Sequence, residues 1–287
     1  MSYASIVITA SGARDDQSAV SVGFELVKRH RAAATVVIAV PAVTRTAGLM
    51  AVGGARSAPV VWQALDDSRS QLVEATLAIV REEAARRGLA MGATDAPPSV
   101  VATLQTTEPW IALQQELPLT DLVVMGPSAA RGEGSWTGPF AEALMSGRSP
   151  VLITGDHRRL EAAPAALAWD GSPEAGRAVR AAVPLLRDAA NVIILQDVDK
   201  LDASPGGAAD PERLTRYLHA RGVPKISVER VTGAKPGPAV LQTARSLDVA
   251  LLVAGAFGHA RLAEAMFGGA TRTFLHAEER PHLFLSH

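Results

Sequence analysis

The chain of 287 residues repeats one short pattern near the end of each half. Residues 119–126 (LTDLVVMG) and 247–255 (LDVALLVAG) both place an aspartate before a short apolar run that ends at a glycine. Further on, each half has a glycine twelve residues before a proline that opens another apolar run; these are Gly138 and Pro150, and Gly269 and Pro281. Matched strings at matched spacing indicate an internal duplication.

Each half also alternates apolar runs with helical patterns. The helical pattern 17–30 lies between two runs in the first half, and 174–187 lies between two runs in the second. Apolar runs without polar alternation are typical of parallel strands covered on both faces. We therefore expect an α/β fold of two tandem doubly wound domains, each with a mainly parallel five-stranded sheet and helices on both faces. The domains would span residues 1–155 and 163–287 and pair as a pseudo-dimer.

The amino-acid composition excludes several classes of protein function. With 48% apolar and 20% charged residues, the chain reads as a globular protein. A net charge of −1 gives no field that favours nucleic acid or an anionic membrane, and no apolar run is long enough to span a bilayer. The first residues lack a signal-peptide pattern, and no cysteine is present, which excludes disulfides and thiolate chemistry. We expect a cytoplasmic protein with no nucleic-acid or membrane partner and no metal site.

A glycine-rich segment after the apolar run 249–254 is the candidate binding site. Its glycines follow the spacing Gly-x-x-Gly, nine residues, Gly-Gly, and a threonine stands two residues further on; the members are Gly255, Gly258, Gly268, Gly269 and Thr271. Glycine permits close backbone approach, and the free N–H groups of a helix start attract anions. The segment therefore predicts a site for a phosphate chain. The alternative is a tight turn and helix cap that serve folding alone.

Asp170 is the second candidate, in the turn Trp-Asp-Gly-Ser-Pro after the apolar run 165–169. Ligands of open parallel sheets bind beyond the carboxyl ends of the strands, where this turn would lie. An aspartate at this place can equally cap the helix that follows. The sequence leaves both roles open.

These residues resemble the universal stress protein family in its tandem two-domain form, over nearly the whole chain. The family signature is a glycine, two residues, a glycine, nine residues, then a glycine followed by serine or threonine. Here Gly269 stands at the hydroxyl position. The resemblance implies that Asp170 contacts adenine and that the glycines, with Thr271 nearby, hold the phosphates of ATP, with or without magnesium. Asp197 stands where the family usually has an apolar residue against the base.

The first half departs further from the family pattern. Ala10-Ser-Gly12 replaces the aspartate turn, and Gly126-Pro127 lacks the second glycine and one backbone donor. We therefore expect domain 1–155 to be degenerate and structural. The resemblance also implies that the last strands of the two domains, residues 151–154 and 282–286, pair with each other.

The expected function is that of a tandem universal stress protein whose C-terminal domain binds ATP as a regulatory signal in the stress response. The sequence shows no catalytic residue in an evident place, so strong catalysis is not expected. Two alternatives stay open: a protein-interaction module of the same fold that binds no nucleotide, and a slow ATP hydrolase. A further homodimer of the whole chain is also expected.

Overall fold

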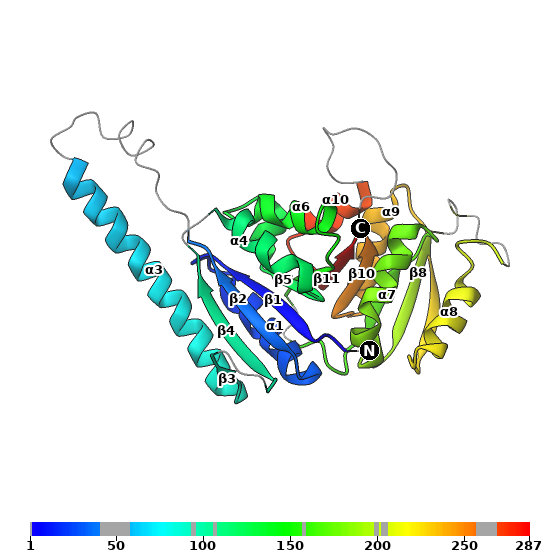
Figure 1. Cartoon of the computed structure of the whole chain (residues 1–287). Helices are drawn as coiled ribbons and strands as arrows, with labels where there is room; N and C mark the ends of the chain where they lie inside the picture. The colour runs from blue at the N-terminus through cyan, green and yellow to red at the C-terminus, as the bar shows by residue number, and fades with distance from the viewer. Residues whose placement is uncertain are drawn as a thin grey trace.

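The strands of the computed structural model form one sheet that runs through both halves of the chain (Figure 1). The structure describes residues 2–40, 58–92, 96–105, 108–156, 159–197, 201, 206–256 and 269–287. The strand order is β3-β4-β2-β1-β5-β6-β11-β10-β7-β8-β9. The strands are β1 (Ser5–Ala10), β2 (Ala33–Ile38), β3 (Ala90–Met91), β4 (Ser99–Leu104), β5 (Leu122–Met125), β6 (Val151–Ile153), β7 (Ala165–Ala168), β8 (Val192–Asp197), β9 (Ile226–Val231), β10 (Leu251–Gly255) and β11 (His282–Ser286).

Helices cover both faces of this sheet, as expected for doubly wound α/β units. They are α1 (Asp16–His30), α3 (Ala58–Arg87), α4 (Pro109–Glu116), α5 (Pro127–Arg131), α6 (Thr137–Met145), α7 (Pro173–Arg187), α8 (Pro211–Ala220), α9 (Pro236–Ser246) and α10 (Gly269–His276). Helices α1, α3, α7 and α8 contribute to the core cluster on one face, and α4, α5, α6, α9 and α10 to the cluster on the other. Both clusters contain residues of both halves, so the two halves share their cores.

One strand pair joins the two expected five-stranded sheets into a single continuous sheet. All neighbouring strands are parallel except β6 and β11, which pair antiparallel with Leu152 opposite Phe284. The edge of each half would otherwise present unpaired N–H and C=O groups, and the pairing satisfies them. The first half also gains the two-residue strand β3. The predicted pairing of the last strands is confirmed, and the order β4-β2-β1-β5-β6 is mirrored by β11-β10-β7-β8-β9.

Local sequence explains where the second half turns from strand to helix. The strand β7 is apolar and buried, and Gly171 then takes a φ of +76°, which suits glycine. The Ser172 side chain accepts a hydrogen bond from the Ala175 N–H, and Pro173 occupies the first helical position of α7. The Asp210 side chain caps α8 in the same way. Both helices therefore begin next to the carboxyl ends of the strands.

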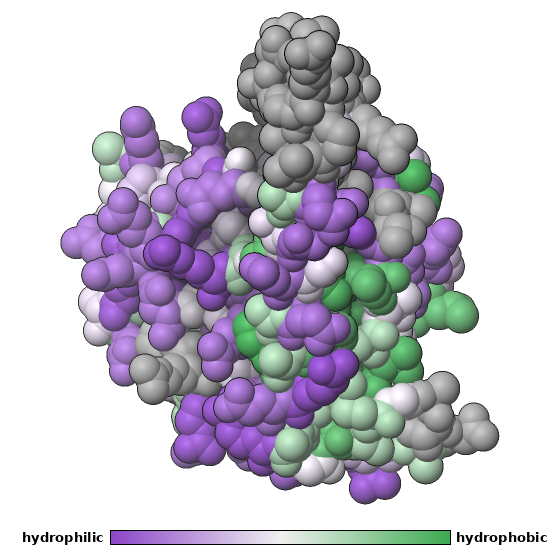
Figure 2. Space-filling model, turned by 90° about the vertical axis from the view of Figure 1, so that its left-hand side faces the viewer, coloured by the Kyte–Doolittle hydropathy of each residue, from purple (hydrophilic) through white to green (hydrophobic). Residues whose placement is uncertain are grey.

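The end of the sheet formed by α3, β3 and β4 carries a mixed surface (Figure 2). Hydrophilic side chains dominate this view, and hydrophobic ones gather together on part of it. The large apolar side chains exposed on these three elements are Leu72, Met91 and Leu104. In the part of the chain that the structure describes, no helix combines the length and the apolar character needed to cross a bilayer.

Candidate functional site

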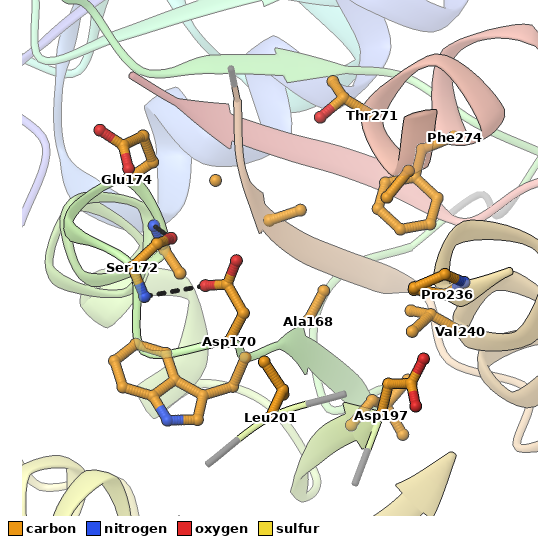
Figure 3. Close-up of a pocket in the computed structure, with 16 residues that line it drawn as sticks. Ala168, Asp170, Ser172, Glu174, Asp197, Leu201, Pro236, Val240, Thr271 and Phe274 are labelled. Carbon is orange, nitrogen blue, oxygen red and sulfur yellow. Dashed lines mark hydrogen bonds between the residues drawn. The ribbon is translucent and has the colours of Figure 1, made fainter. Parts of the chain in front are cut away.

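A cavity of about 250 Å³ opens beyond the carboxyl ends of β7, β8 and β10 (Figure 3). The turn between β7 and α7 forms one wall, and the starts of α9 and α10 form the opposite one. Figure 3 shows Asp170 and Ser172 across the cavity from Phe274 and Val240. Its apolar lining comes from Trp169, Leu195, Leu201, Pro236, Val240, Ala270 and Phe274. Such a cavity at the strand ends is where this type of fold binds ligands.

Asp170 lines this cavity and does not cap α7. Its Oδ1 accepts a hydrogen bond from the Ser172 N–H at 2.9 Å, which closes the turn, while the Ser172 hydroxyl oxygen accepts from the Ala175 N–H at 3.1 Å and caps the helix. The side chain of Asp170 is exposed to solvent. Because Ser172 supplies the cap, the carboxylate of Asp170 keeps its second oxygen on the cavity side (Figure 3).

Gly255 lies at the end of β10, pressed against the first turn of α7. A Cβ at this position would lie 2.5 Å from the Ala175 nitrogen and 2.8 Å from the Glu174 carbonyl carbon. In the first half, a Cβ at Gly126 would lie 2.4 Å from the Asp15 carboxylate. Close packing of strand against helix backbone therefore explains Gly255, whereas the neighbour of Gly126 is the Asp15 side chain.

The other predicted residues lie around α10. Thr271 is buried and lines the cavity from the first turn of this helix (Figure 3). Gly269 begins the helix beside the cavity, and a Cβ there would meet nothing within 4 Å. Gly258 and Gly268 lie outside the described residues. The structure thus brings Asp170, Gly255 and Thr271 together around one cavity.

The charges around the cavity are all negative among the residues described. Asp170, Glu174 and Asp197 line it, and no lysine or arginine does. Glu174 pairs with the Arg177 guanidinium at 2.5 Å, which neutralises part of this charge. Asp197 is buried at the end of β8. No cluster of three or more potential metal ligands occurs within the described ranges.

Sequence reasoning missed most of the apolar lining. Pro236 and Val240 belong to α9, and Phe274 belongs to α10, and all three reach the cavity only through the packing of these helices on the sheet. The sequence does show a helical pattern that begins at Pro236. That pattern predicts a helix, but it does not indicate which of its residues face a ligand.

The comparisons with known proteins agree with this geometry. Residues 165–281, which contain the cavity, match the model of the universal stress protein family. This half of the chain is therefore similar to the universal stress protein family. A search among curated proteins found no match.

Solved structures of other proteins are similar to this chain over nearly its whole length. A universal stress protein from Archaeoglobus fulgidus is similar with a TM-score of 0.66 and 14% identity, covering 98% of this chain and 95% of that one. A protein of unknown function from Pseudomonas aeruginosa PAO1 is similar with a TM-score of 0.58 and 13% identity, covering 99% and 92%. At these identities the likeness shows the fold. The chain therefore shares the fold of these structures over nearly its whole length.

The first half of the chain has two carboxylates at the turn after β1. An oxygen of Asp15 accepts a hydrogen bond from the Ser128 N–H at 2.7 Å, at the start of α5. Asp16 is buried and accepts from the N–H groups of Ser11 at 2.9 Å and Gly12 at 2.7 Å. The chain's own carboxylates thus take the backbone donors at this turn.

Burial gives Asp16 a measurable pH dependence. Desolvation raises the pKa of this carboxyl from 3.8 to about 6, against the lowering effect of the Ser11 and Gly12 N–H groups. Because the folded state holds the proton more tightly, Asp16 stabilises the fold fully below about pH 4 and loses this contribution as the pH rises through about 6. Between pH 4 and pH 7 the parent chain should lose about 2 kcal/mol more than Asp16→Asn in urea unfolding. Parallel pH profiles of the two proteins would contradict the shift.

Proposed function

We propose that the second half binds an adenine nucleotide, ATP, and that binding serves as a regulatory signal in a cytoplasmic stress response. The observation that carries the proposal is the cavity at the carboxyl ends of β7 and β10, in the half that matches the family model. Leu195, Val240 and Phe274 offer apolar surface for a planar base. Asp170 stands at the rim, where its carboxylate can accept from a ribose hydroxyl or an amino group.

The phosphates would extend from this cavity toward Thr271 and the glycine segment that includes Gly258, Gly268 and Gly269. Thr271 offers a hydroxyl inside the cavity. Three carboxylates around the cavity disfavour bare phosphate, so we propose that magnesium accompanies ATP. The first half, residues 1–155, would bind no nucleotide, because Asp15 and Asp16 already take the backbone donors at its turn.

The acidic lining also favours a second candidate function, a protein-interaction module that binds no nucleotide. The described residues lining the cavity include three carboxylates and no cation to offset a triphosphate. Titration with nucleotide separates the two candidates. Turnover assays with and without magnesium separate regulatory binding from slow ATP hydrolysis.

Titration calorimetry with ATP and magnesium should give one binding site per chain. Ala270→Leu would fill the cavity from the first turn of α10 and should weaken ATP binding at least about tenfold, because the base loses its space. Ala277→Leu is the matched control. Ala277 packs at the margin of the same core cluster but does not line the cavity, and this variant should bind as the parent does.

Two other outcomes would overturn parts of the proposal. Two sites per chain would show that the first half also binds, and equal binding by Ala270→Leu and the parent would place ATP elsewhere. No heat at millimolar ATP would leave the interaction module as the function.

A homodimer of the whole chain is also proposed, and sedimentation would test it. The edges of β6 and β11 are already paired with each other. A second copy would therefore need a surface other than these two edges.

A further inference from the structure

A second hollow, of about 410 Å³, lies between α7 and α8 on the other side of the β7–α7 turn. Trp169 and Ser172 line both hollows, so this turn is a common wall. The volume lies within the range of small-molecule sites, about 300 to 1,000 Å³. The nucleotide proposal does not use this hollow, which we call the α7–α8 groove.

The walls of the α7–α8 groove are aromatic and apolar. Trp169 and Tyr217 are half-buried and pack on the core with Val179 and Leu214, which are buried at the base of the groove. The Arg221 guanidinium lies 5.2 Å from the Tyr217 ring centre, which helps to fix that ring. Gly176 adds no side chain on the α7 side, and a Cβ there would meet only the Arg180 Nη1 at 3.4 Å. The groove thus offers fixed rings for stacking.

The charge of the α7–α8 groove is opposite to the charge of the first cavity. Arg180 from α7 and Arg213 from α8 line the groove, and no acidic residue does among those described. Both side chains are exposed, and within the described ranges neither makes a salt bridge, whereas the nearby Arg216 pairs with Glu212 at 3.7 Å. Two arginines on facing helices above aromatic walls suit an anion attached to a planar ring.

We propose that the α7–α8 groove is a second ligand site, for small planar aromatic compounds that carry one anionic group. The ring stacks against Trp169 and Tyr217, and Arg180 and Arg213 bind the anion. The β7–α7 turn that positions Asp170 and Ser172 for the first cavity also forms one wall of this site. The two arginines favour an anion in this groove, whereas the lining of the first cavity described above carries carboxylates and no arginine.

The test uses naphthalene-2-carboxylate as the anionic probe and naphthalene-2-carboxamide as its neutral counterpart. Calorimetry with the full chain should show one site for the carboxylate and at least about tenfold weaker binding of the carboxamide, which lacks the charge. Arg180→Gln and Arg213→Gln should each weaken the carboxylate about tenfold and leave the carboxamide unchanged. Arg216→Gln is the matched control on α8 and should bind as the parent does.

A filling variant separates this site from the first cavity. Gly176→Leu places a side chain in the groove at a helical position where a larger residue favours the helix, so the variant should fold. It should lose carboxylate binding and retain the response to ATP, whatever that response is in the parent. Equal binding of carboxylate and carboxamide, no binding at millimolar concentration, or binding that Ala270→Leu removes and Gly176→Leu leaves intact would each overturn the proposal.

Discussion

Phe284→Ala should lower the free energy of unfolding by about 4 kcal/mol, because it empties a fully buried position at the junction of the two halves. Phe284 stands opposite Leu152 in the β6–β11 pair and belongs to a core cluster that contains residues of both halves. The loss should therefore appear in one cooperative transition of the whole chain. Urea unfolding followed by circular dichroism measures both the loss and the number of transitions.

Val228→Ala is the control for this experiment. Val228 is 43% exposed on β9, the outer strand of the second half, so its truncation should cost less than about 1 kcal/mol. Two separate transitions, with only the second shifted by Phe284→Ala, would show that the halves unfold independently despite their shared sheet.

Gly255→Ala should destabilise the chain by about 2 to 3 kcal/mol, even without any nucleotide. The new Cβ would lie 2.5 Å from the Ala175 nitrogen, so β10 and α7 would have to move apart. Backbone atoms cannot turn aside as a flexible side chain does. Thermal and urea unfolding of nucleotide-free protein test this directly.

Gly269→Ala is the matched substitution at a glycine of the same motif. Nothing lies within 4 Å of its added Cβ, and alanine favours a helix over glycine, so stability should stay within about 1 kcal/mol of the parent. If the Gly255→Ala variant were as stable as the parent and lost only nucleotide binding, Gly255 would be a phosphate contact and not a packing residue.

The duplication and the α/β class could be predicted from the sequence because both depend on local patterns. Apolar runs such as 165–169 became parallel strands, and the helical pattern 174–187 became α7, which begins one residue earlier at Pro173. The pairing of β6 with β11, which joins the two sheets, was predicted only from the family resemblance, because it depends on tertiary contact between residues far apart in the chain.

The candidate site was predictable only in part. Asp170 follows a strand, and Thr271 lies in the first turn of a helix. Positions of both kinds meet at the carboxyl edge of a parallel sheet. Gly255 shows why a motif is ambiguous, since the same residue serves packing against Ala175. Pro236, Val240 and Phe274 carry no local signal of a binding site, because only helix packing turns them toward the cavity.

The antiparallel junction also has a consequence for the newly made chain on the ribosome. Synthesis at about 5 to 20 residues per second lets the first half emerge and fold before the second is complete. Its strand β6 must then wait for β11, which follows the other strands of the described sheet along the chain. For an interval on the order of ten seconds, the partner of Val151–Ile153 does not yet exist. During translation the nascent chain therefore exposes an unpaired edge of β6, which is paired with β11 in the folded protein.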